Sequence, residues 1–183
     1  SWTELDPSLH DALIARTQTV LLRRSLPGTL IYALVVGLCV FNTRFGNDLP
    51  YIAYPAFVLL ATIGVARALL TWKASETTWV RGLSLFIAFA SLATYVGVTL
   101  VSYLHYGFAG ATWPLLLGLA GIAAVSVPNL APARLVAVGY LSIALLPMIP
   151  ALLLKPQPSS INVVLIMTFA YVGIIAIGQR MHI

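Results

Sequence analysis

The sequence predicts an all-α fold: a polytopic membrane protein with six transmembrane helices, both termini in the cytoplasm (N-in/C-in), and a short interfacial amphipathic helix ahead of the first span. The first observation behind this prediction is a set of six apolar stretches. Each is close to the roughly 20 residues that cross a hydrocarbon core of about 30 Å. They cover residues 26–41, 51–70, 82–104, 111–127, 135–154 and 161–178.

The second observation is the distribution of basic residues between the two sides of the membrane. With the N-terminus in the cytoplasm, eight of the ten Lys and Arg residues fall inside, and only Arg44 and Lys155 fall outside. Short loops rich in Lys and Arg stay in the cytoplasm, so this partition favours six spans. The residues predicted inside are Arg16, Arg23, Arg24, Arg67, Lys73, Arg81, Arg134 and Arg180.

The third observation is composition. The chain is 60% hydrophobic and 8% charged, with a mean hydropathy of +0.97, and a soluble domain of this kind would expose one continuous apolar surface. The basic excess follows the cytoplasmic loops, and no soluble segment carries a basic cluster with interleaved aromatics, so membrane lipids are the expected partner and nucleic acid is not. The single cysteine, Cys39, lies within the first span and is expected to be a small buried hydrophobe.

Residues 1–25 are predicted to form a cytoplasmic helix. Asp6-Pro7 resembles a helix N-cap followed by proline at the first helical position. Leu9, Leu13, Val20 and Leu21 then recur at helical spacing, which is typical of an amphipathic helix lying on the inner leaflet. A helix packed against the cytoplasmic side of its own bundle fits the same pattern.

The connections between the predicted spans are short. Outer loops at 42–50, 105–110 and 155–160 and inner loops at 71–81 and 128–134 leave no room for a soluble catalytic or ligand-binding domain. Any signal from outside would therefore be recognised in the membrane or at its rim. The fourth span is rich in small residues, which let helix backbones approach closely; these are Gly118, Ala120, Gly121, Ala123 and Ala124.

The third span carries a polar stripe. At 100° per residue its members lie within about 80° of arc, and such a stripe should face the bundle interior because polar groups are costly against lipid. Two interpretations remain open: hydrogen bonding between helices, or one wall of a pocket that opens outward. The stripe consists of Ser84, Ser91, Tyr95, Thr99, Ser102 and Tyr106, with His105 on its edge.

If a ligand pocket exists, we expect it between the outer halves of the third, fourth and fifth spans. An apolar cavity with a few polar groups at its mouth suits a small hydrophobic or lipid-like molecule. The candidate ligand-binding residues are Tyr95, Ser102, His105, Tyr106 and Trp113.

The sixth span carries a second pattern, which concerns output. Its residues follow a 3, 4, 3, 4 spacing that is typical of a coiled-coil seam, and we expect the helix to continue into the cytoplasm, with residues 179–183 as the start of a signalling helix that extends beyond this chain. A plain C-terminal tail is the alternative. The seam consists of Thr168, Tyr171, Ile175, Gly178 and His182.

Several functional classes are disfavoured. All five acidic residues lie outside the spans, which removes a carboxylate relay for proton-coupled transport. The histidines are spread over different levels or sides of the membrane, and no protease, lipase or nucleotide-binding motif occurs. We therefore expect no catalytic residue, no metal and no cofactor. Arg67 receives a role in topology alone, and its side chain is long enough to snorkel to the cytoplasmic surface.

Over its whole length the chain resembles the N-terminal six-transmembrane input (sensor) region of bacterial sensor histidine kinases, often hybrid ones, and of related diguanylate cyclases. The resemblance implies a homodimer whose sixth helices continue into a cytoplasmic coiled coil, a kinase or cyclase module beyond this chain, and a downstream response regulator. It rests on Leu21-Leu22-Arg23-Arg24-Ser25-Leu26-Pro27, the Ala/Gly-rich fourth span ending at Pro128, Leu146-Pro147, and Gly178-Gln179-Arg180-Met181-His182.

We thus expect residues 26–178 to be a non-enzymatic signal-input domain in the bacterial inner membrane. A small hydrophobic or lipid-like signal would change helix packing, and the sixth span would pass the change to a cytoplasmic histidine kinase. The alternative is a small membrane transporter or channel subunit. The sequence shows neither an ionisable residue along a mid-membrane path nor an inverted repeat of three spans, which such a protein would be expected to have.

Overall fold

The computed structural model describes residues 29–73, 78–130, 134–157 and 160–180, and within these ranges it is all-α, without strands. The predicted all-α class is confirmed. The interfacial helix predicted for residues 1–25 lies outside the described residues. A first helix, Thr29–Asn42, is followed by α2 (Phe45–Asp48), α3 (Pro50–Lys73), α4 (Thr78–Tyr106), α5 (Thr112–Leu130), α6 (Arg134–Leu145), α7 (Met148–Leu154) and α8 (Ser160–Arg180).

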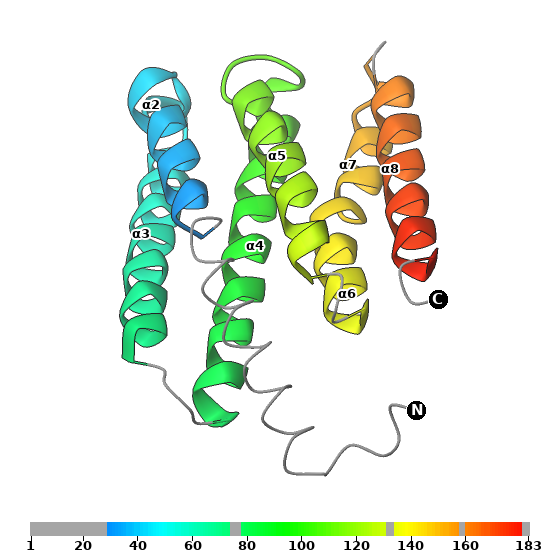
Figure 1. Cartoon of the computed structure of the whole chain (residues 1–183). Coiled ribbons are helices and arrows are strands. Elements are labelled where there is room, and N and C mark those ends of the chain that lie inside the picture. Colours follow the sequence, from blue (N-terminus) through cyan, green and yellow to red (C-terminus); the bar gives the residue numbers. More distant parts are fainter. Residues whose placement is uncertain (1–28, 74–77, 131–133, 158–159, 181–183) are drawn as a thin grey trace, which may run out of the picture.

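The helices run up and down through one bundle. Helix α2, the α4–α5 connection and the start of α8 lie at one end, and the C-terminal ends of α3, α5 and α8 lie at the other (Figure 1). We call these the outer and inner ends. Arg44 and Lys155 flank helix termini at the outer end, whereas the other Lys and Arg residues at helix ends in the described ranges lie at the inner end: Lys73, Arg81, Arg134 and Arg180.

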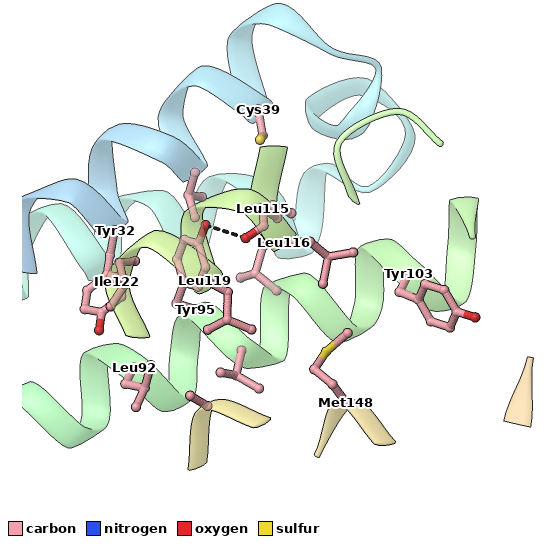
Figure 2. Packing of buried hydrophobic residues seen from close by; sticks show 14 of the residues in the cluster. Tyr32, Cys39, Leu92, Tyr95, Tyr103, Leu115, Leu116, Leu119, Ile122 and Met148 are labelled. Carbon is pink, nitrogen blue, oxygen red and sulfur yellow. Dashed lines mark hydrogen bonds between the residues drawn. The ribbon is translucent and has the colours of Figure 1, made fainter. Parts of the chain in front are cut away.

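Helix α4 is central, because it contacts α3, α5, α6 and α7, whereas α8 packs on α6 and α7. The buried core lies between α4 and the helices around it and includes large side chains such as Tyr95, Leu115 and Met148. Figure 2 shows Tyr95 of α4 reaching α5 within this core. The third predicted span is therefore the element that the rest of the bundle surrounds.

Membrane-crossing length is found in two helices of the part that the structure describes, not in six. Pro50–Leu70 in α3 and Gly82–Tyr106 in α4 are long and apolar enough to cross a membrane. Four other apolar helical stretches are shorter, namely Thr29–Asn42, Thr112–Ala123, Val138–Leu154 and Ser160–Phe169. A membrane location is thus supported in part, and the six-span topology remains a prediction.

The fifth apolar stretch forms two helices rather than one. Helix α6 ends at Leu145 and α7 begins at Met148, with a turn at Leu146-Pro147. Proline has no N–H to donate and its ring crowds the preceding turn, so it interrupts a helix at this point. The ladder resumes irregularly, with the Ile149 N–H bonded to the Leu146 carbonyl at 3.3 Å.

Apolar side chains cover the outside of the bundle as well as its core. Helices Thr29–Asn42, α3, α4, α5, α7 and α8 all expose large hydrophobic residues, including Leu34, Phe41, Phe86, Leu117 and Phe169. A helix that is apolar on every side needs either a protein interior or lipid around it.

Candidate functional site

The polar stripe of α4 lies inside the bundle, as its spacing predicted: Ser84, Ser91, Tyr95, Thr99 and Ser102 are all buried. Its members divide into two groups. The hydroxyls of Ser91 and Thr99 donate to carbonyls of their own helix, those of Ile87 and Tyr95. Such bonds satisfy the hydroxyl within one helix. The remaining stripe residues reach other helices at the inner end, the middle and the outer end of the bundle.

At the inner end, Ser84 contacts a buried arginine. The Arg67 Nε–H of α3 donates to Ser84 Oγ at 3.5 Å, and Arg67 also donates to the hydroxyl of Thr29 on the first helix. Only 3% of Arg67 is exposed. The side chain does not snorkel out of the bundle, as its length would allow, because hydroxyls on two neighbouring helices hold it inside.

A tyrosine pair lies close to this arginine. The hydroxyls of Tyr32 on the first helix and Tyr140 on α6 are hydrogen-bonded to each other, and both tyrosines lie close to Arg67. The Tyr32 ring also packs against that of Tyr95, with centroids 5.1 Å apart. Arg67, Thr29, Ser84, Tyr32 and Tyr140 thus form an inner polar cluster that joins the first helix, α3, α4 and α6.

Sequence reasoning missed this cluster. An available signal was the charge of Arg67 within an apolar stretch, since ionisable residues in such segments usually face the bundle interior and mark functional sites. The identity of its partners was not readable, because Thr29 and Ser84 come from separate helices whose relative placement is a tertiary property.

In the middle of the bundle, Tyr95 joins α4 to α5. Its hydroxyl donates to the Leu115 carbonyl at 2.9 Å, as Figure 2 shows. Gly118 lies against this hydroxyl, and a Cβ at that position would collide with it. Gly118, one of the small residues of the fourth span, therefore leaves the space that the Tyr95 hydroxyl occupies.

At the outer end, the stripe joins α4 to α5 and to α2. The hydroxyls of Ser102 and Thr112 are hydrogen-bonded at 3.0 Å, and the Tyr106 hydroxyl donates to the Asp48 carboxylate at 2.8 Å. The exposed ring of His105 packs edge-on against Tyr106, with centroids 4.6 Å apart.

The five candidate ligand-binding residues do not converge on one point. His105 and Tyr106 are in contact, while the half-exposed Trp113 packs instead on Phe108, with ring centroids 5.6 Å apart. Tyr95 lies seven residues before Ser102, or about 10 Å along the helix. Because Tyr95 and Ser102 bond to α5, they have the interhelical role that the sequence left open as the alternative to a pocket.

A second polar cluster at the outer end involves residues that the sequence did not assign to ligand binding or output. Tyr103, directly after Ser102, is fully buried, and its hydroxyl donates to the Lys155 carbonyl at 2.6 Å. The same hydroxyl lies 3.1 Å from Ser160 Oγ, at the start of α8. Its position beside the stripe was readable, but its partners depend on where the α7–α8 connection lies.

Helix α8 includes four of the five predicted output residues. Thr168, Tyr171, Ile175 and Gly178 lie in one uninterrupted helix, whereas His182 lies outside the described residues. Tyr171 turns toward its own bundle, where its hydroxyl is 3.0 Å from Ser142 Oγ on α6. Thr168 is exposed, with its hydroxyl bonded to the Val164 carbonyl.

Among the described residues, no group of three or more His, Cys, Asp or Glu side chains is placed to hold a metal ion. Cys39 is buried, with its sulfur 3.8 Å from the Ala111 carbonyl oxygen. No model of a known protein family matches the chain, and no curated protein and no solved structure matches it either.

Proposed function

We propose that this chain is a membrane-embedded signal-input module that passes a change in helix packing through α8 to a cytoplasmic histidine kinase. The observation that carries the proposal is the course of α8, a single helix from Ser160 to Arg180. It is attached to the bundle by hydrogen bonds at its outer end and at Tyr171. A continuous helix transmits a rotation or shift along its whole length.

The distribution of apolar and charged residues supports six spans with both termini in the cytoplasm of a bacterium. Large hydrophobic side chains are exposed around the bundle, where lipid would surround them. Among the residues that the structure describes, Lys and Arg at helix ends gather at the inner end, apart from Arg44 and Lys155. That asymmetry agrees with the preference of Lys and Arg for cytoplasmic loops.

The signal is a small hydrophobic or lipid-like molecule recognised near the outer end. His105, Tyr106 and Trp113 are accessible there, while Tyr95 and Ser102 would have to exchange their bonds to α5 for bonds to the ligand. A ligand changes the balance between two packings only through unequal affinity for them, and coupling of about 1–3 kcal/mol is typical. The full-length protein acts as a homodimer with a downstream response regulator.

The test uses the full-length protein, with autophosphorylation of the kinase as the readout. One residue inserted after Gln179 rotates the following helix by about 100°, whereas a seven-residue insertion nearly restores its phase. We expect the single insertion to alter or abolish the response and the seven-residue insertion to preserve most of it. Unchanged output from both would contradict the proposal.

One observation favours the alternative of a small transporter or channel subunit. Arg67 is a buried ionisable residue inside an apolar helix, a feature of ion and substrate pathways. An ion-flux measurement distinguishes the two functions. The purified protein is placed in liposomes that enclose a chloride-sensitive or pH-sensitive dye, and the dye reports the entry of chloride or protons. Flux that is lost in Arg67→Met would establish transport, and its absence together with an insertion-sensitive kinase would establish the sensor.

A further inference from the structure

We propose that the contacts between the end of α4 and the α7–α8 connection form a clasp that sets the position of α8, with Tyr103 as its central residue. The proposal rests on the proposed function, because it names the contact through which α4 would control the output helix. The clasp comprises Tyr103, Phe108, Lys155, Gln157 and Ser160.

The hydroxyls and amides of the clasp form a chain with one direction. Tyr103 has a single hydroxyl proton, which it donates to the Lys155 carbonyl at 2.6 Å. Ser160 must then donate its own proton to Tyr103 Oη, 3.1 Å away, and its oxygen accepts the Gln157 N–H at 2.8 Å. Successive hydrogen bonds polarise and strengthen one another, so this chain acts as a unit.

Contacts also run from the connection back to α4. The Lys155 ammonium donates to the carbonyls of Leu104 at 2.8 Å and His105 at 3.3 Å. These belong to the last turn of α4, where carbonyls lack helical partners and the helix dipole favours a cation. Lys155 therefore accepts from α4 through its backbone and donates to α4 through its side chain.

The turn after α4 closes the clasp. Gln157 Oε1 accepts the Phe108 N–H at 3.2 Å, and the Gln157 side chain packs over Gly107. Gly107 has φ +65°, and a Cβ there would overlap the Gln157 amide. Both the left-handed backbone and the close packing require glycine at this position. The two connections at the outer end are thus fitted to each other.

This arrangement matters for α8 because the helix packs mainly on α6 and α7. The Tyr103–Ser160 hydrogen bond joins α8 directly to α4, the helix at the centre of the bundle. A shift of α4 at its outer end, where His105 and Tyr106 lie, moves Tyr103 with it. The first residue of α8 then either follows Tyr103 or loses the hydrogen-bonded chain.

The experiment compares Tyr103→Phe with Thr94→Val in the full-length protein. Tyr103→Phe keeps the ring, which packs on Phe108 at 5.1 Å, and removes the hydroxyl. Thr94→Val removes an α4 hydroxyl that bonds within its own helix, to the Ala90 carbonyl. Amide hydrogen exchange over residues 160–166 reports the attachment of α8, and kinase autophosphorylation reports output.

We expect Tyr103→Phe to accelerate exchange at the start of α8 and to shift the output equilibrium about 5- to 150-fold, the usual range of coupling between sites. Thr94→Val should change neither. Ser160→Ala should reproduce the effect of Tyr103→Phe, and the double variant should add little to either single one, because all three break the same chain.

The outcomes separate this proposal from the proposed function. Unchanged exchange in Tyr103→Phe, or additive effects of Tyr103→Phe and Ser160→Ala, would overturn the clasp. An output that responds to the insertion after Gln179 but not to Tyr103→Phe would also overturn it and leave the sensor function intact. Faster exchange together with an output insensitive to both changes would contradict the sensor function.

Discussion

Arg67 and Thr29 are 38 residues apart in the chain, yet the Arg67 guanidinium donates a hydrogen bond to the Thr29 hydroxyl inside the bundle. Both residues are buried. A hydrogen bond between a charged donor and a buried acceptor is stronger than a neutral one. This contact fixes the first helix against α3 near the inner end.

Thr29→Val should therefore destabilise the protein by about 1.5 kcal/mol, because it removes an acceptor from a buried charge. The measurement is unfolding by SDS in mixed micelles, followed by tryptophan fluorescence. Thr62→Val is the matched control, since Thr62 is exposed and bonds within α3, to the Val58 carbonyl. Equal losses of stability from the two substitutions would contradict a stabilising role of the Arg67–Thr29 hydrogen bond.

Substitution by alanine at two glycines of α5 should change the stability of the protein in opposite directions. Gly118→Ala places a methyl group against the Tyr95 hydroxyl and should cost about 1–3 kcal/mol by overpacking. Gly121→Ala meets nothing within 4 Å and should stabilise the helix by up to about 1 kcal/mol. The same unfolding assay checks both.

Tyr95→Phe tests the cause of the Gly118→Ala effect. Removing the hydroxyl relieves the collision, so the double variant should recover part of the lost stability. Recovery should be incomplete, because the new methyl group also meets Val35 Cγ1 at 3.2 Å. No recovery would mean that the Tyr95 hydroxyl is not the obstacle.

Substitutions at Ser91 distinguish the effect of losing a hydroxyl from the effect of adding side-chain volume. Its hydroxyl serves only a carbonyl of its own helix among the bonds described, so Ser91→Ala should be close to neutral. Ser91→Leu should cost about 1–3 kcal/mol, because the site is fully buried and has to accommodate three more carbons. Leu85→Phe, at a half-buried position, should be milder, and a larger effect there would contradict this account.

Cysteine labelling in a Cys39→Ser background tests the topology. Cysteines at Asn47 and Ala109, both exposed at the outer end, should react with an impermeant reagent from outside, and one at Thr77 should react only from inside. Gly46 is unsuitable for a probe, because a Cβ there would meet the Val40 carbonyl at 2.5 Å. Any other labelling pattern would overturn the N-in/C-in arrangement.

The features that could be predicted from the sequence are those that depend on a single helix. The burial of Ser84, Ser91, Tyr95, Thr99 and Ser102 followed from their shared face, since a polar face is costly against lipid. The continuity of α8 past Gly178 followed equally from local pattern. Periodicity carries this information because it is a property of a single element.

Contacts between elements were not readable. The direction of Arg67 depends on the placement of Thr29 and Ser84, and the role of Tyr103 depends on the α7–α8 connection beside it. The division of the fifth stretch at Leu146-Pro147 is different, because it could have been predicted from the sequence. Proline interrupts a helix, but the uniformly apolar composition of residues 135–154 favoured a single span. Tyr171 was predicted to lie in a seam that faces a partner helix. Its hydroxyl contacts Ser142 on α6 of the same chain, a neighbour that the spacing within α8 does not reveal.

The burial of Arg67 also bears on the order in which the bundle assembles. In the proposed membrane, inserting α3 alone exposes an arginine to lipid, which costs about 2.5–3.5 kcal/mol at mid-bilayer and less for Arg67, because it lies toward the inner end. Thr29 precedes Arg67 in the chain, so during synthesis an acceptor is already present when α3 leaves the ribosome, whereas Ser84 emerges later. The first helix would thereby act as an internal chaperone for α3, and a protein made without it should insert α3 less efficiently.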